Sequence, residues 1–130
     1  MQDRPGVDEL LEAVAGFLQD DVMPNTSGRL SFHARVAGNV IQMLRRELAL
    51  EEVHLAREWE GLDAVVGPQP RPASLVETRT ALIGRNEDLA QRIRGGEADE
   101  PAFRKKLLAH LRTMMHDKLE VSNPGLLAQG

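Results

Sequence analysis

Apolar residues recur every three or four positions along most of the chain, which is the spacing of one face of an α-helix. The longest such pattern spans residues 28–49, where two neighbouring apolar strips follow the expected helix. No segment shows the strict alternation of apolar and polar residues that indicates a half-buried β-strand. The pattern therefore predicts an all-α fold, a single-domain bundle of about five helices near residues 7–22, 28–49, 52–66, 74–94 and 101–121.

Helix-breaking residues support most of these boundaries. Three prolines within residues 67–73 predict a stiff, non-helical connector in the middle of the chain. Ser74, followed three residues later by Glu77, matches a helix-capping box. The boundary near residues 49–52 is less sharp. A short turn is expected there because Glu51 and Glu52 would interrupt the apolar strip, and the alternative is one long helix that continues to residue 66.

Composition and charge exclude several classes of partner and of chemistry. A net charge of -4, three Phe, one Trp and no Tyr argue against a nucleic-acid partner, which needs a basic surface and stacking rings. No apolar stretch approaches the roughly 18 residues of a membrane span, so no membrane partner is expected. The acidic N-terminal residues are unlike a signal peptide, which favours a cytoplasmic protein. Because cysteine is absent, disulfides and thiol chemistry are excluded.

A few polar residues stand on otherwise apolar helix faces. His33 lies beside the main strip of residues 28–49, with Arg29 one turn earlier, and Asn86 and Lys118 interrupt later strips. In the structural interpretation, His33 is a hydrogen-bonded core histidine, Asn86 is a buried amide and Lys118 extends its charge to water. In the functional interpretation, the three side chains form one polar site in the interior. The candidate polar site is therefore Arg29, His33, Asn86 and Lys118, with no residue assigned as catalytic.

Metal and cofactor motifs find little support in the sequence. Di-iron sites in helix bundles need two Glu-x-x-His motifs, and only Glu51 and His54 form one. His110 and His116 are six residues apart and do not share a helix face. Phosphate-binding glycine loops and nucleophile elbows are absent as well. We therefore expect no metal and no cofactor, and an enzymatic function is not favoured.

Three segments together resemble a known family: ELLEAVAGFLQDDVMP, GRLSFHARVAGNV and HLRTMMHDKLEVSNP. The chain is similar to a bacterial family of small helical proteins of unknown function. Members of that family are often encoded beside aminoglycoside-phosphotransferase-like kinases and acyl-CoA dehydrogenases. The resemblance implies an accessory role near such enzymes, and it supplies no site residues to carry over.

Two functional hypotheses follow. The first is an accessory or protein-interaction module, with a protein partner or a second copy of the chain. In the homodimer form of this hypothesis, the helices at 28–49 and 52–66 make the contact, with Trp59 in it. The alternative is a small ligand-binding domain or enzyme with a polar interior site around His33.

Overall fold

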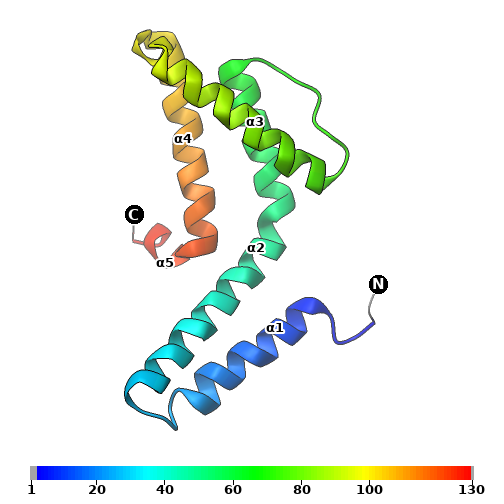
Figure 1. The fold of residues 1–130 in the computed structure, drawn as a ribbon, viewed down its shortest axis with the longest axis vertical. Coiled ribbons are helices and arrows are strands. Elements are labelled where there is room, and N and C mark those ends of the chain that lie inside the picture. Colours follow the sequence, from blue (N-terminus) through cyan, green and yellow to red (C-terminus); the bar gives the residue numbers. More distant parts are fainter. Residues whose placement is uncertain (1–2, 130) are drawn as a thin grey trace. The chain divides into compact units, whose positions relative to one another are not determined.

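The computed structural model describes residues 3–129, and no β-strand occurs among them, so the predicted all-α fold class is confirmed (Figure 1). By its internal contacts the chain divides into two compact units, Met1–Ala49 and Leu50–Gly130, called unit 1 and unit 2 below. The elements in order are α1 (Val7–Gly16), a π-helical segment (Phe17–Val22), α2 (Gly28–Val66), α3 (Leu75–Arg94), a 3₁₀ turn (Glu97–Asp99), α4 (Pro101–Ser122) and α5 (Pro124–Leu127).

The α2 helix runs without a break through residues 49–52, so the expected turn is wrong and the alternative of one long helix is confirmed. Residues 49–52 read Ala-Leu-Glu-Glu, which are good helix formers, and none of them removes a backbone donor. Glu51 does not disrupt packing, because it accepts a hydrogen bond from Arg79 of α3. That bond holds the pKa of Glu51 below its ordinary value. Glu52 is exposed to solvent.

Unit 1 is a helical hairpin of α1 and the first part of α2. The two helices approach closely where residues are small: Ala34 is buried, and a Cβ added to Gly38 would lie 2.6 Å from Cγ of Gln19. At the open end of the hairpin, Arg45 donates to both carboxylate oxygens of Asp8, at 2.8 and 3.0 Å. Arg45 thereby holds the pKa of Asp8 below its ordinary value. The hairpin is thus closed by small residues and ion pairs, with few large side chains between the helices.

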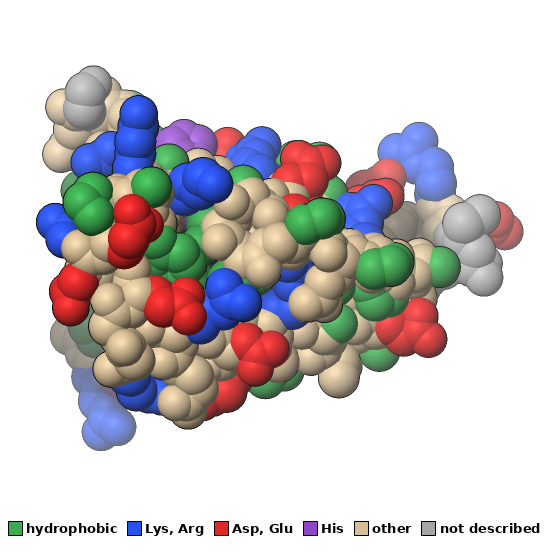
Figure 2. All heavy atoms as spheres, turned by 90° about the horizontal axis from the view of Figure 1, so that it is seen from above, with side chains coloured by type: hydrophobic (Ala, Val, Ile, Leu, Met, Phe, Trp, Pro, Cys, Tyr) green, Lys and Arg blue, Asp and Glu red, His purple; other side chains and the backbone are tan. Residues whose placement is uncertain are grey.

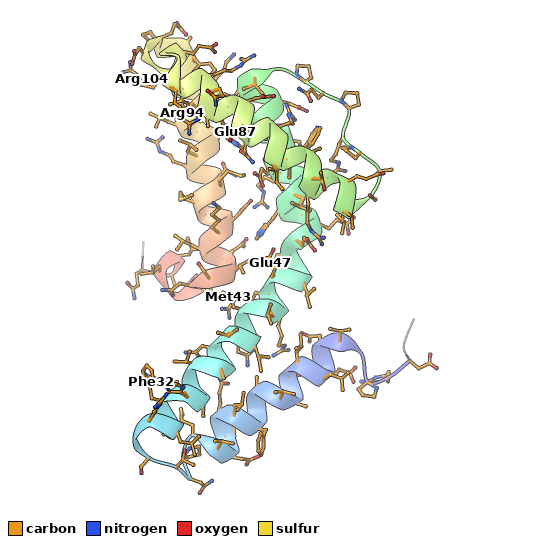
Figure 3. All side chains as sticks on the ribbon, in the orientation of Figure 1. Phe32, Met43, Glu47, Glu87, Arg94 and Arg104 are labelled. Atoms are coloured by element: carbon orange, nitrogen blue, oxygen red, sulfur yellow. The ribbon has the colours of Figure 1, made fainter. Side chains whose placement is uncertain are left out.

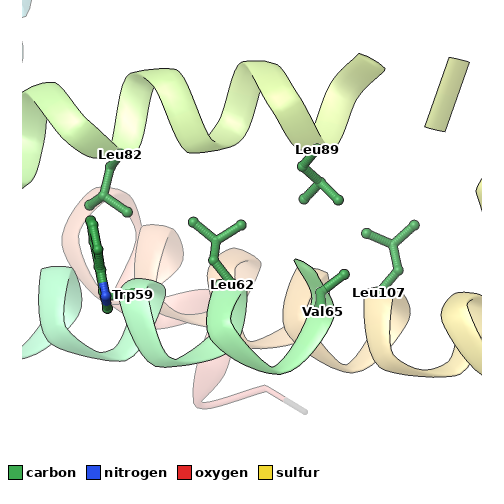
Figure 4. Close-up of a cluster of buried hydrophobic side chains, with 6 residues drawn as sticks. All are labelled: Trp59, Leu62, Val65, Leu82, Leu89 and Leu107. Atoms are coloured by element: carbon green, nitrogen blue, oxygen red, sulfur yellow. The ribbon is translucent and has the colours of Figure 1, made fainter. Parts of the chain in front are cut away.

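The apolar core of unit 2 lies where the second part of α2 meets α3 and α4 (Figure 4). Leu62 is its most deeply buried member, with no exposed surface. The core positions are three residues apart on α2 and seven apart on α3, as helical faces require. The cluster consists of Trp59, Leu62, Val65, Leu82, Leu89 and Leu107.

A buried arginine links the proline-rich connector to this core through hydrogen bonds. Arg85 of α3 is 4% exposed, and its guanidinium carbon lies 4.5 Å from the centre of the Trp59 ring. It donates to the Asp63 carboxylate at 2.9 Å and to the backbone oxygen of Gly67, just past the end of α2, at 2.9 Å. Trp59 donates in turn to the backbone oxygen of Gln69 at 2.9 Å. Since Trp59 is 4% exposed, it is not available for a dimer contact, contrary to the sequence hypothesis.

The helix ends predicted around the connector are confirmed. Ser74 caps α3 by accepting a hydrogen bond from the backbone N–H of Glu77 at 3.1 Å. Gly96, in the left-handed conformation at φ 91°, follows the end of α3. Glu100 caps α4 by accepting from the backbone N–H groups of Ala102 and Phe103, which lowers the pKa of its carboxyl.

On the face drawn in Figure 2, acidic and basic side chains are interspersed and neither sign gathers in a patch. Among the described residues, no helix combines the length and the apolar character that crossing a membrane requires.

Candidate functional site

The four residues of the predicted polar site are all exposed. Arg29 and His33 belong to unit 1, and Asn86 and Lys118 belong to unit 2. The prediction that His33, Asn86 and Lys118 occupy core positions is therefore wrong. Asn86 donates to the exposed face of α2 instead, with Nδ2 2.8 Å from Oε1 of Glu58. Helical spacing predicts the angle of each residue around its own helix. It does not predict which face of that helix a neighbouring helix covers, and these four residues lie on uncovered faces.

A different set of polar residues meets inside unit 2, and we call it the His54 cluster: His54, Arg57, Asp117 and Glu120. His54 and Arg57 stand three residues apart on α2, and Asp117 and Glu120 stand three apart on α4, so each pair shares one helix face. The Nε2 atom of His54 lies 2.7 Å from Oε2 of Glu120 and 3.9 Å from Oδ1 of Asp117. Arg57 donates to the same Oδ1 atom.

Asp117 is the most buried member of the His54 cluster. Its side chain is 6% exposed, whereas those of His54 and Glu120 are 15% and 35% exposed. The second carboxylate oxygen, Oδ2, is buried and has no hydrogen-bond partner among the described residues. A buried carboxylate is costly unless its oxygens are satisfied. Arg57 offsets the charge on one side only, because it binds Oδ1.

The donor set of the His54 cluster is one that binds cations. His54, Asp117 and Glu120 each offer one ligand atom, and the three atoms lie within 4.8 Å of one another. An imidazole nitrogen with two carboxylate oxygens is a common protein donor set for divalent transition metals. Sequence motifs do not identify this set, because a motif lies within one helix and these donors come from α2 and α4. The available signal was the Asp-x-x-Glu spacing of Asp117 and Glu120, but nothing in the sequence pairs it with His54.

A pocket of about 380 Å³ lies beside the His54 cluster, and Arg57 borders both. His110 of α4 also lines the pocket, and it is 5% exposed with its Nδ1 atom lacking a hydrogen-bond partner. Burial lowers the pKa of His110, and the nearby Arg85 charge lowers it further, while Glu58 acts in the opposite direction. His110 is therefore a neutral, packed histidine near pH 7. The remaining lining residues are Glu60, Gly61, Ala64, Lys106, Ala109 and Thr113.

Unit 1 carries a second feature, an exposed apolar face on α2. Unit 1 holds eleven of the twenty large apolar side chains that are exposed among the described residues, although it is the smaller unit. The expected strip containing Leu30, Leu44 and Leu48 is exposed at all three positions, because α1 packs on a neighbouring face of α2 around Ala34. A further exposed strip consists of Phe32, Val36, Val40 and Met43, and we call it the α2 strip (Figure 3).

The model of a domain of unknown function, DUF6285, matches residues 24–126 of the chain. The matched range includes all of α2, α3 and α4, and therefore both the His54 cluster and the α2 strip. No curated protein and no solved structure matches the chain.

Proposed function

Because the chain belongs to the DUF6285 family of unknown function, we propose from its own surface that it is a protein-interaction module that forms an antiparallel homodimer through the α2 strip. The observation that carries the proposal is the exposure of this strip. Phe32, Val36, Val40 and Met43 are 53%, 43%, 48% and 36% exposed on successive turns of one helix. Soluble monomers seldom leave a continuous row of large apolar side chains in water, and such rows mark contact surfaces.

The residues at the two ends of the α2 strip favour a second copy of the chain as the occupant. Arg29 stands one turn before Phe32, and Glu47 stands one turn after Met43, so the row begins with a cation and ends with an anion. Figure 3 shows Phe32, Met43 and Glu47 following one another along α2. Neither Arg29 nor Glu47 forms an ion pair with any residue from 3 to 129.

Antiparallel pairing about a two-fold axis near the level of residue 38 places apolar side chains against apolar side chains and the cation against the anion. Val36 then lies opposite Val40 of the second copy, and Phe32 lies opposite Met43 and Leu44. Arg29 meets Glu47, and both stand at the same angle around the helix, in line with the strip itself. Such a contact is isologous, the usual form in soluble dimers. Parallel pairing would instead place Arg29 against Arg29 and Glu47 against Glu47, which is unfavourable.

Sedimentation of charge variants tests both the surface and the direction of pairing. We expect the wild-type chain to sediment as a dimer at micromolar concentration, and Arg29→Glu or Glu47→Arg to weaken the dimer by placing like charges together. The double variant Arg29→Glu with Glu47→Arg should restore it. If the single variants dimerise like wild type, the antiparallel pairing is refuted.

A substitution in the centre of the α2 strip tests the apolar contact itself. Val36→Glu should give a monomer, because it buries a charge at the centre of the interface. Ile83→Glu is the matched control, since Ile83 is an equally apolar, 73% exposed residue on α3 outside the strip. Circular dichroism checks that both variants remain helical. A wild-type chain that stays monomeric through the micromolar range overturns the proposed homodimer, even if another molecule binds the strip.

The accessory role implied by the resemblance extends this proposal to a second protein. The partner we propose is a kinase-like or acyl-CoA-oxidising enzyme, bound by an exposed face outside the α2 strip. Leu30 and Leu48 offer one such face on the same helix. Co-purification of each candidate enzyme with wild type and with Leu48→Glu tests this extension. Loss of the enzyme with Leu48→Glu, while the dimer persists, is the expected result, and absence of any co-purifying enzyme contradicts it.

A further inference from the structure

We propose that His54, Asp117 and Glu120 form a binding site for one divalent transition metal ion of the Zn²⁺ or Mn²⁺ class. This site does not depend on the proposed dimer, because all three residues belong to unit 2 and the α2 strip belongs to unit 1. The three ligand atoms lie within 4.8 Å of one another. Ions that prefer all-oxygen cages, such as Ca²⁺, fit less well, because one of the three donors is an imidazole nitrogen.

The distances between the donors suit a single ion. Two ligands that each lie about 2.1 Å from one ion are roughly 3.0–3.4 Å apart in octahedral or tetrahedral geometry. His54 Nε2 lies 2.7 Å from Glu120 Oε2, and a small side-chain rotation brings this pair into that range. The same nitrogen lies 3.9 Å from Oδ1 of Asp117, and because Arg57 holds Oδ1, the ion would take Oδ2 of that carboxylate. The donors come from two helices that share the packed core of unit 2.

An independent observation points to a cation at this place. The Asp117 side chain is 6% exposed, yet its Oδ2 atom has no hydrogen-bond partner among the described residues. Buried carboxylate oxygens are ordinarily satisfied, and each exception needs a physical reason. A bound cation supplies the missing partner. It also accounts for a carboxylate being held in the interior beside a histidine and a second carboxylate.

Arg57 has a supporting role in this arrangement. Its guanidinium donates to Oδ1 of Asp117, which leaves Oδ2 as the free oxygen. Carboxylates that bind metals are usually held in orientation by such outer hydrogen bonds. Arg57 also lines the pocket of about 380 Å³. Three protein ligands leave further coordination positions for water.

Isothermal titration calorimetry with Zn²⁺ and with Mn²⁺ on the metal-free full chain tests the proposal directly. We expect one site per chain with at least one of the two ions. His54→Gln and Glu120→Gln each remove one donor while keeping the side-chain size, and each should weaken binding about tenfold or more. His33→Gln is the matched control, because it removes an exposed histidine in unit 1 and should leave binding unchanged.

Several results would overturn the proposal. If His54→Gln and Glu120→Gln bind the ion as wild type does, the ion is adventitious only. Absence of binding by either ion in the micromolar range also refutes it, as does a loss of binding that His33→Gln shares. Asp117→Asn extends the test, and since it alters a buried group, its circular dichroism spectrum must match wild type. Should that variant not fold, the His54 and Glu120 variants decide the question alone.

Discussion

Replacing Gly61 by alanine should destabilise unit 2, although the same replacement stabilises most helices. Gly61 lies inside α2, and a Cβ there would stand 2.8 Å from Cε1 of His110, with Nδ1 nearer still. His110 is 5% exposed, so its ring has little room to move. Overpacking of this kind costs about 1–3 kcal/mol. The gain in helix propensity is only about 1 kcal/mol, so the net change is a loss of up to roughly 2 kcal/mol.

Gly84→Ala is the matched control for this prediction. Gly84 is also helical, in α3, but it is exposed, and a Cβ there would meet no atom within 4 Å. That variant should therefore show the propensity gain alone, about 0.5–1 kcal/mol of added stability. Urea unfolding followed by Trp59 fluorescence measures both, because Trp59 is the chain's one tryptophan and lies in the core of unit 2. The difference between the two variants isolates the clash.

A double-mutant cycle identifies the group responsible for the clash. His110→Ala removes the ring and should itself destabilise unit 2 by opening a cavity. In that background, Gly61→Ala should become neutral or stabilising, which gives a coupling energy of about 1–3 kcal/mol. If Gly61→Ala stabilises the wild-type chain as much as Gly84→Ala does, the close approach of α2 to His110 is refuted. A cycle without coupling refutes the assignment to His110.

Three further predictions concern unit 2. Arg85→Met keeps the apolar stem but loses the hydrogen bonds to Asp63 and Gly67, so urea unfolding should show a loss of about 2–3 kcal/mol. Ser74→Ala removes the α3 cap and should cost about 1 kcal/mol in the same assay. Burial lowers the pKa of His110 below its ordinary 6.5, so the unfolded chain takes up that proton first. The contribution of His110 to the free energy of unfolding should therefore be constant above pH 6.5 and fall as the pH drops below it. Urea titrations between about pH 8 and pH 5 measure this dependence, and His110→Gln should lack the contribution of His110.

The candidate site illustrates where the sequence stops being informative. Helical spacing places His33 and His110 equally well on helix faces, yet one is exposed and the other is 5% exposed. The difference depends on which face a neighbouring helix covers. In unit 1, α1 packs around Ala34 and leaves His33 in water. In unit 2, α4 lies so close to Gly61 of α2 that the His110 ring is enclosed.

The sequence by itself determined the local structure of this protein. The helical class, the cap at Ser74, the proline-rich connector and the glycine end of α3 all follow from residue types acting on their own backbone. The helix-forming residues at 49–52 allow α2 to continue past Glu51, whereas the tertiary structure supplies the Arg79 side chain that binds this carboxylate. Tertiary structure also brought His54 to Asp117, which lies sixty-three residues away in the chain. Contacts between helices depend on how faces pack, and the period of one helix does not contain that information.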